Sequence, residues 1–171
     1  MTDSDYRDAF HRYKDLLFRF VYRMTGSGSV AEDLVQECFT SLWEHPGRYD
    51  SGRGALQAYL LGMARNLVFK RWSRERRYGS EEPEVLVCPP FDVLRMERSE
   101  AIAAAVQALP SLQREALVLA EYEELSLDEI ARATGADLAA VKSRLHRARQ
   151  NLRRVLAPLL ETKRNLHGTP K

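Results

Sequence analysis

The chain has 171 residues and a mass of 19.6 kDa, which excludes a large multidomain enzyme and allows one ordinary domain or two small ones. Hydrophobic residues make up 44% and charged residues 29%, so packed cores can form and a wholly disordered chain is excluded. The formal net charge is only +2, so a surface that attracts a polyanion must come from local clustering of charge.

No apolar run approaches the ~18 residues of a membrane-spanning helix, and the acidic start of the chain is unlike a signal peptide. We therefore expect a cytoplasmic protein with no membrane insertion. Cys38 and Cys88 are too few for a disulfide framework and too far apart for a zinc cluster. The sequence predicts no metal and no cofactor.

The first half of the chain is predicted to form three amphipathic helices. Apolar side chains recur every three or four residues over the segments 6–24, 31–43 and 56–72. Trp43 and Trp72 lie on these apolar stripes, which is more typical of core residues than of exposed ones. We expect the three helices to form one domain over residues 1–78.

A second domain is predicted after a change in composition. Residues 79–93 contain three prolines and no sustained periodicity, which is typical of a flexible linker. Helical periodicity returns over 94–157, and an irregular tail is expected over 158–171, beginning at Pro158. No segment has the alternation of a strand. The predicted fold class is all-α, with two small helical domains joined by a flexible linker.

The second domain contains the pattern of a helix-turn-helix. Ser126 and Glu129 match a capping box, Gly135 allows a left-handed turn, and Asp137 can cap the helix that follows. The buried face of that helix is predicted to hold Val141, Leu145, Ala148 and Leu152. Its exposed side chains can meet phosphates or base edges in a major groove, and they are Lys142, Ser143, Arg144, His146, Arg147 and Arg149.

Two basic blocks stand out on an otherwise acidic chain. Residues 142–164 hold eight lysines and arginines against one acid, and residues 65–78 hold six against one. Together they suggest two contacts with a polyanion, although one such block alone can equally be a solvated helix end. Trp72 lies among the cations of the first block, a combination that can grip unpaired bases.

The order of these elements resembles the extracytoplasmic-function (ECF) group of bacterial sigma factors, the promoter-recognition subunits of RNA polymerase. Residues 31–43 resemble the segment with which that family binds core polymerase, and residues 64–77 resemble its minus-ten segment. Residues 109–149 resemble its minus-thirty-five domain, and the run 141–149 is the most specific part. The resemblance covers nearly the whole chain in the correct order.

This resemblance implies a role for each surface. Core-polymerase binding is expected at Asp33, Leu34, Gln36, Glu37 and Thr40. Recognition and opening of the minus-ten element is expected at Arg65, Asn66, Lys70, Arg71, Arg74, Arg76 and Arg77. The basic helix 142–149 would read the minus-thirty-five element. The implied partners are core RNA polymerase, through its β′ coiled coil and β flap, promoter DNA and an anti-sigma factor.

Two other functions are weighed against this one. A conventional helix-turn-helix regulator would bind DNA without polymerase, commonly as a dimer, and the acidic exposed face of 31–43 and the lack of a ligand domain argue against it. An enzyme acting on DNA would need clustered carboxylates or a nucleophile, and only Asp33 and Glu37 offer a pair. We therefore expect a promoter-specificity factor that is not an enzyme.

Overall fold

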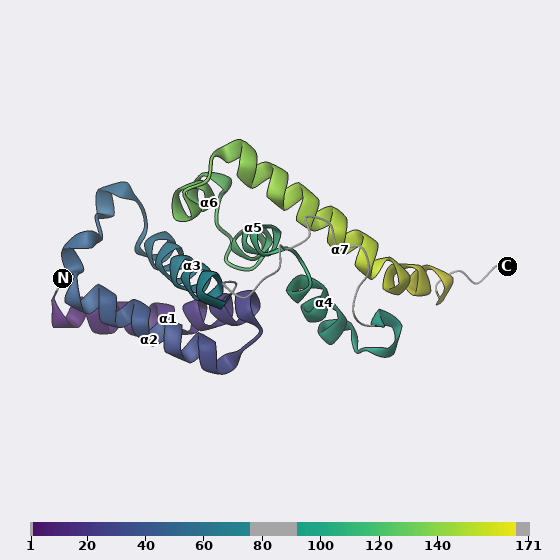
Figure 1. The fold of residues 1–171 in the computed structure, drawn as a ribbon, viewed down its shortest axis with the longest axis horizontal. Coiled ribbons are helices and arrows are strands. Elements are labelled where there is room, and N and C mark those ends of the chain that lie inside the picture. The colour runs from purple at the N-terminus through teal and green to yellow at the C-terminus, as the bar shows by residue number, and fades with distance from the viewer. Residues whose placement is uncertain (1, 76–91, 167–171) are drawn as a thin grey trace.

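The structure is a computed structural model that describes residues 2–75 and 92–166. Within these ranges the chain forms seven α-helices and short 3-10 turns, without a strand. Figure 1 shows two groups of helices, α1 to α3 and α4 to α7, that lie against each other. The predicted all-α fold with two small helical units is confirmed.

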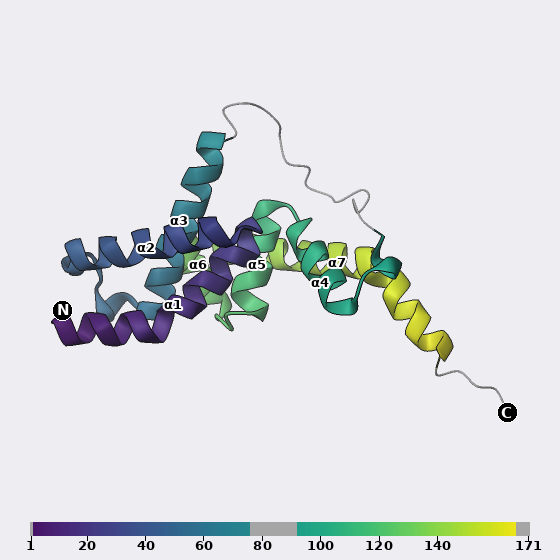
Figure 2. The same ribbon diagram turned by 90° about the horizontal axis from the view of Figure 1, so that it is seen from below.

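The first group consists of α1 (Asp3–Thr25), α2 (Gly28–Glu44) and α3 (Leu56–Glu75). α1 ends where Gly26 adopts a left-handed backbone with φ 71°, a conformation that glycine reaches without steric cost. The chain then turns back, and α2 lies along α1 in both views (Figure 1 and Figure 2). Two single 3-10 turns, Pro46–Arg48 and Ser51–Arg53, carry the chain from α2 to α3.

The second group consists of α4 (Arg98–Gln107), α5 (Ser111–Glu121), α6 (Leu127–Thr134) and α7 (Leu138–Leu166). The predicted helix-turn-helix is confirmed in α6 and α7. The Ser126 hydroxyl accepts a hydrogen bond from the Glu129 backbone N–H, and the Glu129 carboxylate accepts one from the Ser126 backbone N–H. Gly135 makes the turn with φ 68°, and Asp137 Oδ1 accepts a hydrogen bond from the Ala140 N–H at 2.7 Å.

The predicted irregular tail is wrong over its described residues, 158–166, because α7 continues through Pro158 to Leu166. A proline inside a helix removes one backbone hydrogen bond and clashes with the preceding turn. Here apolar packing outweighs that cost, since Leu156 and Leu159 pack against a small cluster around Val93 and Val155. α7 changes direction toward its C-terminal end (Figure 2).

One apolar core runs through both groups of helices. Its fully buried side chains include Leu17, Phe20 and Leu60 from the first group and Leu119 and Ile130 from the second. The core is continuous because α3 contacts α6 and α1 contacts α5. The sequence predicted two domains, but it did not predict that they pack against each other over a shared apolar core.

Several further predictions concern segments at the edge of the described structure. Of the predicted linker 79–93, residues 79–91 lie outside the described ranges, and Val93 begins a 3-10 turn, Val93–Arg95. Cys88 is likewise outside them. Cys38 is fully buried, and burial raises the pKa of its thiol to about 12, so it stays protonated and packs as a small apolar group.

No helix in residues 2–75 and 92–166 is long and apolar enough to cross a bilayer.

The continuation of α7 through Pro158 can be tested by Pro158→Ala. Alanine restores the missing N–H donor and removes the ring clash, so helix content should rise and the free energy of unfolding should increase by up to about 3 kcal/mol. Circular dichroism and chemical denaturation measure both quantities. Pro110→Ala is the matched control, because Pro110 lies before the first residue of α5 and interrupts no helix. Equal responses of the two variants would contradict a helix through Pro158.

Candidate nucleic-acid and protein interfaces

The N-terminal half of α7 places the predicted DNA-contacting side chains on its outer side. Val141, Leu145 and Ala148 are at most 5% exposed and hold the helix against the core. Because a helix turns once every ~3.6 residues, the intervening positions face solvent. The predicted residues that are exposed are Lys142, Ser143, His146, Arg147 and Arg149, and Arg144 is half-buried.

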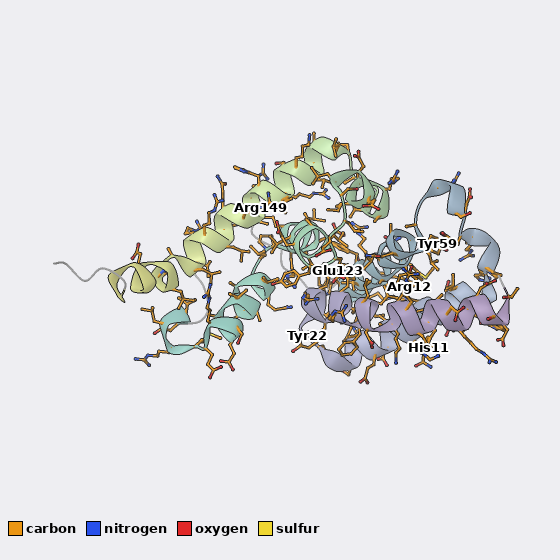
Figure 3. All side chains as sticks on the ribbon, turned by 180° about the vertical axis from the view of Figure 1, so that it is seen from behind. His11, Arg12, Tyr22, Tyr59, Glu123 and Arg149 are labelled. Carbon is orange, nitrogen blue, oxygen red and sulfur yellow. The ribbon has the colours of Figure 1, made fainter. Side chains whose placement is uncertain are left out.

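Two acidic residues of α5 lie next to this helix, and the sequence analysis gave them no role. Glu121 Oε1 accepts hydrogen bonds from Arg149 at 3.1 Å to Nε and 2.5 Å to Nη2. The pair is about half exposed, so its contribution to stability is small, ~0–1 kcal/mol, but it fixes the direction of the guanidinium. Figure 3 labels Arg149 on α7. Glu115 is also on α5, and its burial raises its pKa, while the charges of Arg65 and Arg144 act in the opposite direction.

The predicted minus-ten residues on α3 divide into exposed and paired groups. Asn66, Lys70 and Arg74 are exposed, while Arg71 pairs with Glu75 on the same helix at 3.1 Å. Arg76 and Arg77 lie outside the described residues. The same helix also carries the half-buried rings of Phe69 and Trp72. Cations and aromatic rings therefore lie together on one helix, the combination that suits a single strand.

Arg65 differs from the rest of this set because its partner comes from the second group of helices. Its Nε donates a hydrogen bond to Oε1 of Glu115 at 2.5 Å, and its guanidinium carbon lies 4.3 Å from the centre of the Phe69 ring. Glu115 is 1% exposed, and burial raises its pKa above the ordinary value while Arg65 works in the opposite direction. The sequence gave no signal for this pairing, since the two residues are 50 positions apart.

A cavity of about 670 Å³ lies beside Asn66, between α3 and the turns at 46–54. Tyr49 and Tyr59 form part of its wall, with ring centres 5.4 Å apart, and the Tyr49 hydroxyl donates to the Gly54 carbonyl at 3.2 Å. The other side of the cavity is formed by α6. The cavity combines aromatic faces with an amide side chain, which can hold a base that has left the stack.

The predicted polymerase-binding segment forms an exposed acidic face on α2. Asp33, Gln36, Glu37 and Thr40 are all exposed at helical spacing, whereas Leu34 is 6% exposed and packs in the core beneath them. Such a face repels DNA and suits a basic protein surface.

Trp43 extends this acidic face, contrary to its expected place in the core. It is 51% exposed and packs edge-to-face with Tyr6, with ring centres 4.9 Å apart. The apolar stripe of α2 ends one residue earlier, at the buried Leu42, which leaves the indole outside. A half-exposed tryptophan beside polar groups is a frequent anchor in protein interfaces.

The fold and these surfaces are those of a two-part helix-turn-helix protein with basic faces on α3 and α7 and a separate acidic face on α2. No group of three metal-ligating side chains occurs in the part of the chain that the structure describes. Two family models match the chain, Sigma-70 region 2 over residues 9–78 and Sigma-70 region 4 over residues 99–152.

Two relatives show the similarity in sequence. The chain is 30% identical to the ECF RNA polymerase sigma factor SigW of Bacillus subtilis, with 92% of each chain covered. It is 33% identical to the ECF RNA polymerase sigma factor SigE of Mycolicibacterium smegmatis, over 85% of this chain and 59% of that one. The chain belongs to the ECF family of sigma-70 RNA polymerase sigma factors, and the resemblance found in its sequence is confirmed.

Solved structures share the fold. The sigma factor RpoE of Bartonella quintana, solved with the anti-sigma factor NepR, aligns with a TM-score of 0.73 and 24% identity over 90% of this chain and 97% of that one. CnrH, solved with the cytosolic domain of CnrY, aligns with a TM-score of 0.70 and 21% identity over 92% and 90%.

The ion pair between Arg149 and Glu121 generates a prediction. Glu121→Gln removes a carboxylate from the edge of the basic face and releases Arg149, so affinity for duplex DNA should rise about twofold to fivefold and the salt slope should steepen by up to ~0.9. Fluorescence anisotropy with a labelled mixed-sequence duplex across a salt series measures both. Glu44→Gln makes the same charge change at an exposed position on α2, in the first group of helices. If the two variants gain equally, Arg149 does not lie at the DNA surface.

Proposed function

We propose that the chain binds core RNA polymerase, directs it to specific promoters and initiates transcription there. The observation that carries this proposal is the separation of charge between helices: an acidic exposed face on α2, and basic exposed faces on α3 and on the N-terminal half of α7. One protein-binding and two DNA-binding surfaces on a single small chain match the needs of a promoter-specificity factor.

We propose that the two groups of helices correspond to two functional domains. Residues 1–78 would act as the region 2-like domain, 94–157 as the region 4-like domain, 79–93 as the linker and 158–171 as a C-terminal tail. Matches to Sigma-70 region 2 at 9–78 and region 4 at 99–152 support these limits. The continuation of α7 to Leu166 means that the tail begins within a helix.

In this proposal α2 docks on the polymerase. Asp33, Gln36, Glu37 and Thr40 would meet the β′ coiled coil, and the exposed indole of Trp43 would add an apolar anchor at the end of the same face. Leu34 would act indirectly, because it is buried and shapes the face from beneath. The second domain would contact the β flap.

Two surfaces of different composition would bind DNA. The N-terminal half of α7 would enter the major groove of the minus-thirty-five duplex, with Lys142, Ser143, His146 and Arg147 nearest the base edges. The basic half of α3 would hold the phosphates of the separated minus-ten strand, and the cavity beside Asn66 would take an unstacked base.

Sigma factors are DNA-binding transcription initiation factors without catalytic activity of their own, and we assign this chain no reaction. We propose that the chain acts in the cytoplasm and that an anti-sigma factor regulates it. The structural neighbour RpoE, which was solved with the anti-sigma factor NepR, supports the latter. A conventional helix-turn-helix regulator remains the second candidate, but the acidic face on α2 has no role in it.

Reconstitution with core RNA polymerase tests the proposal. Wild-type chain should give promoter-dependent transcripts, and the double charge reversal Asp33→Lys with Glu37→Lys should lower them at least about tenfold, because a basic partner is then repelled. Co-purification with core enzyme and run-off transcription measure binding and function. The matched control is Asp8→Lys with Asp15→Lys, which reverses two exposed acids on α1. Transcripts that survive the reversal on α2 would remove this face from the interface.

A second prediction separates base reading from phosphate contact along α7. Arg147→Ala should cost ~1–3 kcal/mol on the preferred upstream element and little on a scrambled duplex, because its position on the helix is close to base edges. Arg153→Ala, two turns later, should weaken binding to both duplexes equally and lower the salt slope by about one. Equal losses on both duplexes for Arg147→Ala would move the base-reading role to another residue.

A further inference from the structure

Ala139, in the first turn of α7, is an exposed side chain to which the sequence analysis gave no role. It precedes Lys142, Ser143 and His146 by three, four and seven residues, so it lies on the same side of the helix as these polar side chains. At ~100° per residue, the four positions fall within an arc of about 100°, and Ala139 lies near the middle of that arc.

The opposite side of the same turns is buried, and this fixes the direction in which Ala139 points. Val141 and Leu145 are 1% and 5% exposed and pack in the core. The start of the helix is held by Asp137, whose Oδ1 accepts a hydrogen bond from the Ala140 N–H at 2.7 Å. Rotating α7 to turn Ala139 inward would expose two core side chains, so its methyl group points outward.

Ala139 also lies at the end of α7 that enters the groove in the proposed complex. In a helix-turn-helix the N-terminal residues of the recognition helix meet the base edges. Ala139 is the second residue of α7 and precedes Lys142 by about 4.5 Å along the helix axis. Leu138 is 36% exposed, but it lies two turns before the buried Leu145 on the same side and therefore faces away from the groove.

The chemistry of an alanine side chain limits what it can recognise on a base edge. Its methyl group neither donates nor accepts a hydrogen bond, so contact with a donor or acceptor would remove water from that group without replacing the hydrogen bond. In the major groove, the C5-methyl group of thymine is the apolar group that a base edge offers. Thymine is therefore the base that fits Ala139.

The small size of this side chain and the polar side chains beyond it fit the same interpretation. A longer side chain in the first turn would hold the helix away from the base edges, whereas alanine allows close approach. The axial distance of about 4.5 Å from Ala139 to Lys142 compares with ~3.4 Å between base pairs. The methyl contact thus falls one or two base pairs from the bases that the hydrogen-bonding side chains read.

We propose that Ala139 is a specificity-determining residue, and that its methyl group contacts the C5-methyl group of one thymine in the upstream promoter element. The inference rests on the proposed function, because it takes α7 as the helix that enters the major groove. Ala139 carries no charge, so its contribution depends on the base sequence and leaves the salt dependence of binding unchanged.

Replacing thymine by deoxyuridine tests the proposal, because the exchange removes only the C5-methyl group of the base. The full chain first selects its preferred duplex from a library with a randomised segment. That duplex is then resynthesised with deoxyuridine at one thymine position at a time, and affinities are measured by fluorescence anisotropy. Wild-type chain should lose about threefold to fivefold in affinity at one position, the factor expected for one buried methyl group.

The variant Ala139→Gly removes the methyl group from the protein instead. It should bind the thymine duplex about threefold to fivefold more weakly, no longer distinguish thymine from deoxyuridine at that position, and keep the salt slope of wild type. Ala140→Gly is the matched control, because it places glycine in the same helical turn at a half-buried position ~100° away. This control should keep the thymine preference, and circular dichroism checks that both variants have the same helix content.

The outcomes separate this inference from the proposed function. If the chain selects a defined sequence but deoxyuridine has no effect at any position, the role of Ala139 is overturned. A thymine preference that Ala139→Gly retains, or that Ala140→Gly loses to the same extent, overturns it as well. In these cases base reading by α7 stands. A chain that selects no sequence from the library overturns base reading by α7, and with it both the proposed function of this helix and the inference.

Discussion

The close crossing of α3 and α6 at Gly62 is the contact on which the rest of the arrangement depends. It brings the two helices so close that a Cβ atom on Gly62 would come within 3.0 Å of a backbone carbonyl oxygen of α6. It also lets the apolar core pass from α1 and α3 into α5 and α6, and buries Glu115 beside Arg65. Buried carboxylates are costly unless a cation meets them, so Glu115 and Glu123, which pairs with Arg23, specify which face of the second half fits the first. Apolar packing supplies most of the stability, and the ion pairs determine how the two groups of helices align.

Segregation of charge among helices explains how so small a chain can have several partners. The net charge of +2 hides an acidic face on α2 and basic faces on α3 and α7. Each surface attracts one kind of partner and repels the other, because like charges across an interface are costly. The helices that carry these surfaces are positioned by apolar stripes on their opposite sides, so function and folding use different faces of the same helix.

Several cationic side chains serve both within the chain and, as proposed, toward DNA. Arg65 pairs with Glu115, Arg149 pairs with Glu121, and Arg144 lies close enough to Glu115 to favour its charged form. A carboxylate beside an arginine fixes the direction of the guanidinium and, like a phosphate, can accept two hydrogen bonds from it. Under the proposed function, exchange of a carboxylate for a phosphate would couple DNA binding to the internal contacts of the protein.

The sequence alone determined the helices, the helix-turn-helix and the family. Apolar spacing, the Ser126 and Glu129 capping box and Gly135 act within one helix or turn, so local sequence is sufficient to predict them. The extension of α7 past Pro158, the exposure of Trp43 and the pairing of Arg65 with Glu115 were decided by tertiary structure. The extension of α7 and the ion pair depend on packing between residues far apart in the chain, and a buried ion pair formed across 50 positions leaves no periodic pattern in the sequence.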